Sequence, residues 1–128
     1  MPSSNRAKKT KDNYKVGREY EELAAQFFLE NGFHVLHRNY RAGHKEIDLI
    51  VRKGDLVAFV EVKSAKSKSL GHPSERITKK KKENLIKAAQ TYLIENKIDD
   101  SDFRFDAVTF VNGKLEHYPD AFSLSDDD

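Results

Sequence analysis

Apolar and polar positions follow a helical period in two parts of the chain. In "GREYEELAAQFFLENG" apolar residues recur three and four positions apart, which is typical of an amphipathic helix that ends at Asn31-Gly32. The same pattern predicts a second helix from Lys79 to Asn96, with Thr78 as a suitable N-cap. The expected buried faces are Tyr20, Leu23, Ala24, Phe27 and Phe28 in the first helix, and Leu85, Ile86, Ala89, Tyr92 and Leu93 in the second.

The segments outside the helices follow the two-residue period of β-strands. "FHVLHRNY" predicts one strand, and "EIDLIVRKGDLVAFVEVK" predicts a hairpin that turns at Lys53-Gly54. "DFRFDAVTFV" and "KLEHY" predict two more strands, joined at Asn112-Gly113. The order is therefore helix, three strands, helix, two strands. Because each helix has one apolar stripe, each must pack on the sheet, which predicts an α/β fold with a mixed sheet flanked by helices.

Length and composition indicate one domain. The 128 residues suffice for one core, and residues 15–122 contain all the periodic segments. Residues 1–14 are expected to be a disordered basic segment, and residues 123–128 a disordered acidic tail. The chain has no cysteine, so disulfides and thiolate metal sites are excluded. No secretory signal or membrane-spanning run is found, and a cytoplasmic protein without a membrane partner is expected.

Charge is distributed unevenly. The net charge is +7 from Val62 to Lys82 and −7 from Glu95 to Asp128. A basic segment of this density indicates a polyanionic partner, although a solvated lysine-rich loop and helix start would show the same composition. The candidate phosphate contacts are Lys66, Lys68, Arg76, Lys79, Lys80, Lys81 and Lys82.

The central hairpin carries charges inside otherwise apolar strands. With a turn at Lys53-Gly54, alternation places Glu46, Asp48, Glu61 and Lys63 on one face, with Asp48 opposite Phe59. Asp48 and Glu61 are then diagonal neighbours, and a divalent cation could contact both carboxylates. The alternative is a solvent-facing strand surface on which Lys63 forms a salt bridge with Glu46 or Glu61.

These residues resemble a known family. Asp48 followed by Glu61-Val62-Lys63 resembles the D…(D/E)xK motif of the PD-(D/E)xK nucleases, and the element order is similar to their restriction endonuclease-like αβββαβ core. The chain is more closely similar to the YraN-like family of uncharacterised bacterial proteins, described as candidate endonucleases. The matching segments are "GREYEELA", "NYR", "EIDLI", "FVEVK", "AAQTYL" and "FD". Tyr20, Lys45 and Ala65 depart from the usual family residues, which affects expected substrate contacts more than metal binding.

The resemblance implies the chemistry of the site. Asp48, Glu61 and the Val62 carbonyl would bind Mg²⁺ or Mn²⁺, and Glu21 would add a ligand from the first helix. Lys63 would orient the attacking water and stabilise charge on the phosphate. Helical angles do not separate Glu21 from Glu19, so this choice depends on the family. Glu46 is expected to support the site rather than bind metal directly.

Three functions are compatible with these features. The first is a metal-dependent nuclease acting on nucleic acid, DNA more than RNA and including branched DNA, which as a homodimer could cut both strands. The second is a nucleic-acid-binding module of nuclease fold without catalysis. The third is a protein-assembly domain with a salt-bridged surface. Retention of Asp48, Glu61 and Lys63 favours the first over the second, since binding alone needs no paired carboxylates.

Overall fold

The computed structural model describes residues 17–65 and 78–122. A helix over residues 17–30 precedes the other elements. These are β1 (His34–Ala42), β2 (Lys45–Lys53), β3 (Leu56–Ala65), α3 (Lys79–Glu95), β4 (Asp102–Val111) and β5 (Lys114–Phe122). The predicted order of elements is confirmed. The expected disordered ends, and the candidate phosphate contacts Lys66, Lys68 and Arg76, lie outside the described residues.

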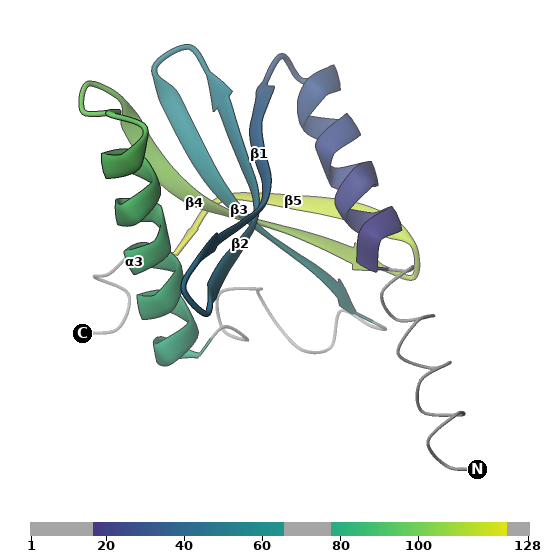
Figure 1. Ribbon diagram of the computed structural model, residues 1–128. Coiled ribbons are helices and arrows are strands. Elements are labelled where there is room, and N and C mark those ends of the chain that lie inside the picture. Colours follow the sequence, from purple (N-terminus) through teal and green to yellow (C-terminus); the bar gives the residue numbers. More distant parts are fainter. Residues whose placement is uncertain (1–16, 66–77, 123–128) are drawn as a thin grey trace.

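The five strands form one mixed sheet in the order β1-β2-β3-β4-β5. β3 and β4 are parallel, and the other neighbouring strands are antiparallel. The helix of residues 17–30 and α3 lie on opposite sides of the sheet (Figure 1). The predicted α/β class, a mixed sheet flanked by helices, is therefore confirmed.

The start of α3 and the end of the first helix lie where the sequence predicts. α3 begins at Lys79, directly after the N-cap Thr78, whose Oγ1 accepts a hydrogen bond from the Lys81 amide at 3.1 Å. The first helix ends at Gly32, which has a φ of +86°, and the Phe33 amide donates to the Phe28 carbonyl at 2.9 Å. A side chain at Gly32 would be strained by that φ and would lie 3.3 Å from the Lys53 side chain.

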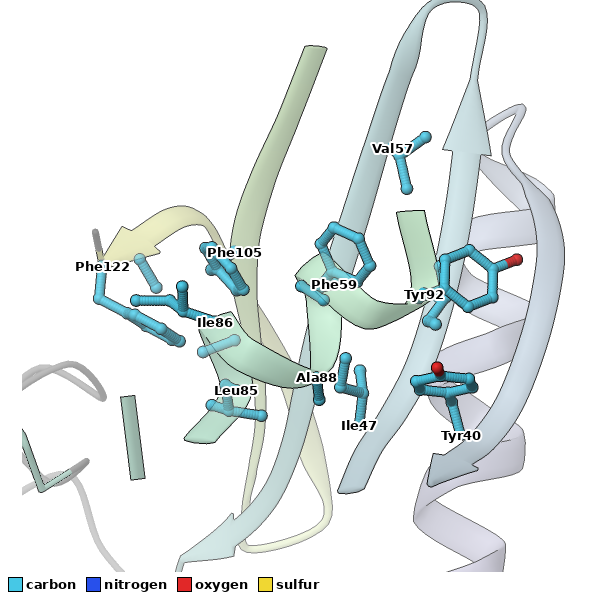
Figure 2. Close-up of a cluster of buried hydrophobic side chains, with 14 residues drawn as sticks. Tyr40, Ile47, Val57, Phe59, Leu85, Ile86, Ala88, Tyr92, Phe105 and Phe122 are labelled. Atoms are coloured by element: carbon cyan, nitrogen blue, oxygen red, sulfur yellow. The ribbon is translucent and has the colours of Figure 1, made fainter. Parts of the chain in front are cut away.

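α3 covers an aromatic core on one side of the sheet. Leu85, Ile86, Ala89 and Tyr92 are buried there, as predicted, and Leu93 is partly buried against the same cluster. Figure 2 shows the sheet side chains that meet this helix. They are Tyr40, Ile47, Val57, Phe59, Phe105 and Phe122.

The N-terminal helix covers a second core, with several alanine side chains, on the opposite side of the sheet. Ala24 and Phe28 are buried as predicted, and Tyr20 and Phe27 are partly buried against them. Leu23 was predicted to be buried but is 51% exposed, because Ala25 takes the inner position beside Ala24. Small alanine side chains let this helix approach the sheet closely, which brings its first turns toward β2 and β3.

The turn between β2 and β3 differs from the prediction. The ladder pairs Lys53 with Leu56 and Ile50 with Phe59, so Gly54-Asp55 forms the turn instead of Lys53-Gly54. Gly54 has a φ of +59°, which a glycine adopts at little cost. The register therefore differs by two residues from the predicted one. An even shift keeps strand faces together, so the predicted faces survive over most of the hairpin.

Candidate functional site

The hydrogen-bonded pairing of β2 with β3 is interrupted at Asp48. The pairing of β2 with β3 stops at Leu49–Val60, and the Val62 amide donates to Asp48 Oδ2 at 2.8 Å instead of to a β2 carbonyl. The N–H and C=O groups of one strand residue point to the same side, so the Val62 carbonyl also faces Asp48. The Asp48 carboxylate thus lies between the two strands and accepts the hydrogen bond that a backbone carbonyl of β2 would otherwise accept.

Residues on either side of Asp48 show the same break in the strand pattern. Ile47 was predicted to share a face with Leu49 and Val51, but it is buried on the α3 side with Tyr40 (Figure 2). On β1, Arg38 pairs with Leu49 and Tyr40 pairs with Ile47, which places Asn39 opposite Asp48. Asn39 has a φ of +52°, an uncommon conformation in a strand. The backbone is therefore distorted on both sides of this acid.

A cavity of about 440 Å³ lies beside this opening. Glu21, Glu46, Asp48 and Lys63 contribute its charged side chains, and Gly17, Tyr20, Val62 and Ser64 complete its lining. Three carboxylates and one lysine therefore share one pocket. The N-terminal helix contributes Glu21, which is partly buried, whereas Glu19 is exposed and does not line the cavity. The structure thus separates the two acids that helical angles could not.

Asn39 connects two of these acids and was not predicted as a site residue. With its side-chain nitrogen turned toward the carboxylates, it donates to Glu21 Oε2 at 2.9 Å and to Glu46 Oε1 at 3.3 Å. Glu46 also lies 3.5 Å from the Arg41 guanidinium. The only sequence signal for Asn39 is the "NYR" segment of the family resemblance, because an asparagine in a strand carries no pattern of its own.

Glu61 occupies a different position from the one predicted. It is 6% exposed and does not line the cavity, and its Oε1 lies 3.3 Å from the Lys81 ammonium of α3. Its other oxygen, Oε2, is buried without a hydrogen-bond partner among the residues described. The expected sharing of one strand face by Asp48, Glu61 and Lys63 is therefore only partly realised. Glu61 and Asp48 are nevertheless close enough to affect each other electrostatically.

The pKa values of Asp48, Glu61 and Glu21 are raised. Burial, followed by the charge of Glu61, raises the pKa of Asp48 to about 7, although the Val62 amide opposes the shift. Burial also raises the pKa of Glu61, against the lowering effects of Lys81 and Lys63. Burial and the charge of Glu46 raise the pKa of Glu21. A cation near these buried carboxylates would favour their charged forms.

The four lysines at the start of α3 do not form a single phosphate-binding group. Lys79 and Lys80 are exposed and remain suitable for phosphate contacts. Lys81 pairs with Glu61, and Lys82 is 7% exposed, which argues against a phosphate contact there. The sequence could not distinguish them, because four consecutive lysines point in four directions around a helix.

The donor set fits a hard divalent cation. Carboxylates and a backbone carbonyl are the ligands that Mg²⁺ and Mn²⁺ prefer, and the unpartnered Glu61 Oε2 could accept a cation. Within residues 17–65 and 78–122, no three acidic or histidine side chains are already grouped as metal ligands. Lys81 contacts the other oxygen of Glu61, Oε1, so an ion near this carboxylate would lie close to the Lys81 ammonium.

Asp106 is a second buried carboxylate, and its partners are all protein groups. Arg104 donates to both of its oxygens, at 2.8 and 3.1 Å, His117 lies 2.8 Å away, and the Asp120 amide donates at 3.0 Å. Although burial acts in the opposite direction, these bonds lower the pKa of Asp106. Asp106 therefore fastens β5 to β4 where their register shifts.

The arrangement of strands and helices indicates the fold of the protein. Its five-stranded mixed sheet with a helix on each side is consistent with the restriction endonuclease-like fold. The chain belongs to UPF0102, an uncharacterised protein family whose model matches residues 20–110. This membership confirms the YraN-like resemblance drawn from the sequence. Within the part of the chain described, no helix is long and apolar enough to cross a membrane.

The matches to several relatives extend over most of the chain. A UPF0102 protein of Chloroherpeton thalassium is 43% identical over 99 residues, covering 77% of each chain. One from Sulfurihydrogenibium sp. is 37% identical over 113 residues, covering 88% of this chain and 98% of its own. One from Anaeromyxobacter dehalogenans is 40% identical over 111 residues, covering 84% and 83%.

Proposed function

We propose that this protein is a metal-dependent nuclease that hydrolyses phosphodiester bonds of nucleic acid, DNA more than RNA. The observation that carries the proposal is the cavity that unites Glu21, Asp48 and Lys63 at a break in the sheet. The raised pKa of Asp48 supports it, because displaced pKa values and distorted backbone occur together at functional sites. The negative charge of Asp48 gives the fold no evident structural advantage, because burial disfavours it.

Each residue has a defined task in this proposal. Asp48, Glu61, the Val62 carbonyl and Glu21 would hold Mg²⁺ or Mn²⁺. The bound ion would supply charge stabilisation at the phosphate and lower the pKa of an attacking water. Lys63 would orient that water and stabilise negative charge on the phosphate. Asn39 would hold Glu21 and Glu46 in place through its amide.

Lys81 would act as the cation of Glu61 while no metal is bound. The ammonium and the carboxylate are 3.3 Å apart, and an ion that contacts Glu61 would compete with this pair. Metal binding would then release Lys81 toward the solvent, where Lys79 and Lys80 already lie. A released lysine next to the site could contact a substrate phosphate.

Cleavage assays test this proposal directly. Labelled linear, flapped and four-way DNA, together with RNA, would be incubated with Mg²⁺ or Mn²⁺. We expect cleavage of at least one substrate and a rate loss of about 10²–10³ in Lys63→Ala, which is typical for one transition-state donor. Asp48→Asn should lose the metal-dependent rate as well.

A matched control shows whether the loss is specific to the site, and the loss in Lys63→Ala and Asp48→Asn excludes contaminating nucleases. Asp55→Asn removes a carboxylate from the exposed β2–β3 turn and should cleave like the parent. If the parent binds nucleic acid but cleaves no substrate, the non-catalytic binding module replaces the nuclease. If it neither binds nucleic acid nor responds to Mn²⁺ in melting experiments, both readings fail and the assembly domain remains.

A further inference from the structure

A second cavity, of about 400 Å³, lies between the β1–β2 hairpin and α3. Arg41 and Lys45 line it from the two strands next to the hairpin turn. Lys87, Thr91 and Glu95 line it from the helix. None of these residues lines the acidic cavity, to which Glu46 belongs.

The charge of this second cavity is positive. Of the described side chains that line it, three are cations and one, Glu95, is an acid. The Glu95 carboxylate accepts a hydrogen bond from the Tyr40 hydroxyl, which directs it toward the buried aromatic cluster. The three cations therefore face the cavity against a single acid that is already hydrogen-bonded.

The positive cavity adjoins the acidic one. Arg41 Nη2 lies 3.5 Å from Glu46 Oε2, so one ion pair joins a residue of each cavity. The Arg41 side chain is 73% exposed, and an exposed pair of this kind contributes little stability. Arg41 can therefore contact an anion in solution without a large loss.

The helix extends the positive surface toward the start of α3. Lys80, Lys87 and Thr91 are spaced by seven and four residues, so they lie on one face of the helix. All three are exposed. A line of two cations and a hydroxyl thus runs along α3 from its lysine-rich first turn to the second cavity.

We infer that the cavity formed by Arg41, Lys45 and Lys87 binds the phosphodiester backbone of the nucleic acid strand next to the scissile phosphate. This inference rests on the proposed nuclease function and identifies which surface the substrate follows. The lining offers ammonium, guanidinium and hydroxyl donors, which match phosphate oxygens. Among the described residues that line it, none has an aromatic ring on which a base could stack. The contact therefore positions the strand without reading its sequence.

Binding without catalysis tests the inference. Affinity for a labelled duplex would be measured in EDTA across a range of salt concentrations. The double variant Lys45→Gln with Lys87→Gln should reduce the salt slope by about two units, since each duplex phosphate contact contributes about 0.9. Arg41 is kept, so the ion pair with Glu46 and the acidic cavity stay unchanged.

Controls separate this inference from the proposed function. Lys114→Gln removes an exposed lysine from β5, at the far edge of the sheet, and should keep the parent slope. The double variant should also keep the parent's Mn²⁺-induced rise in melting temperature. If the parent binds the duplex and the double variant shows the same slope, the cavity is not a backbone site, whereas the nuclease proposal stands. If the parent binds no nucleic acid, both proposals fail.

Discussion

Replacing Asp48 with asparagine should stabilise the metal-free protein at alkaline pH. The asparagine carbonyl can still accept the hydrogen bond from the Val62 amide, so the opening of the sheet is preserved. The change removes only the negative charge that burial and Glu61 disfavour. A residue that supports folding would give the opposite result on substitution.

The magnitude follows from the displacement of the Asp48 pKa from 3.8 to about 7. At ~1.36 kcal/mol per unit, ionisation in the folded protein costs about 4 kcal/mol. The folded state binds the proton more tightly than the unfolded chain does. This contribution to stability is therefore fully present below pH 3.8 and is lost as the pH rises through about 7. About 2.5 kcal/mol of the loss falls between pH 5 and pH 8.5.

Urea unfolding in EDTA, followed by circular dichroism, gives the required free energies of unfolding. The parent should lose stability relative to Asp48→Asn between pH 5 and pH 8.5, and millimolar Mn²⁺ should restore stability to the parent alone. Asp99→Asn, an exposed acid after α3, serves as the control and should follow the parent. Parallel profiles for the parent and Asp48→Asn would show that this carboxylate bears no unusual cost, and the argument for a cation site would lose its electrostatic basis.

Two further substitutions test the other buried acids. Lys81→Met should destabilise the metal-free protein by about 1–2 kcal/mol, because Glu61 would lose its cation, and adding Glu61→Gln should recover most of the loss. Lys80→Met is the matched control, and equal losses from both lysines in thermal unfolding would contradict the pairing. Asp106→Asn should cost roughly 3 kcal/mol at pH 7, since Arg104 and His117 would lose the negative charge and one of the two acceptor oxygens. Because the pKa of Asp106 is lowered in the folded protein, the difference in free energy of unfolding between the parent and Asp106→Asn is present above pH 3.8 and should shrink as the pH falls below it. A difference that persists at pH 2 in urea titrations would show that packing, not charge, is responsible.

The order of elements could be predicted because it depends on periodicity alone. The helical stripes and the alternating strands each recur over many residues, and a mistake at one position, such as Leu23, changes little. The turn of the central hairpin was harder, because Lys53-Gly54 and Gly54-Asp55 are both acceptable turn sequences. Only packing against the rest of the sheet selects between two registers that expose the same faces.

The site was predicted in its residues more than in its geometry. Asp48, Lys63 and Glu21 meet in one cavity, as the family resemblance implies. The position of Glu61 could not be foreseen, because its partner Lys81 belongs to α3 and lies far from Glu61 in the sequence. Asn39 was missed for a similar reason, since its conformation and its two acidic neighbours arise only when three elements pack together.

The central ladder of the sheet joins strands that are distant in the sequence. β3 and β4 pair in parallel from Leu56–Asp102 to Ala65–Val111, so this ladder can form only after α3 has crossed over the sheet. The β2–β3 hairpin closes through a short turn and is able to form first. A hairpin that forms first would bring Asp48 and Glu61 together before Lys81 arrives with α3, and their repulsion would then oppose an early stage of folding. Refolding should accordingly be faster in stopped-flow experiments at pH 5 than at pH 8.5, which makes the proposed cation a factor in how quickly the chain folds.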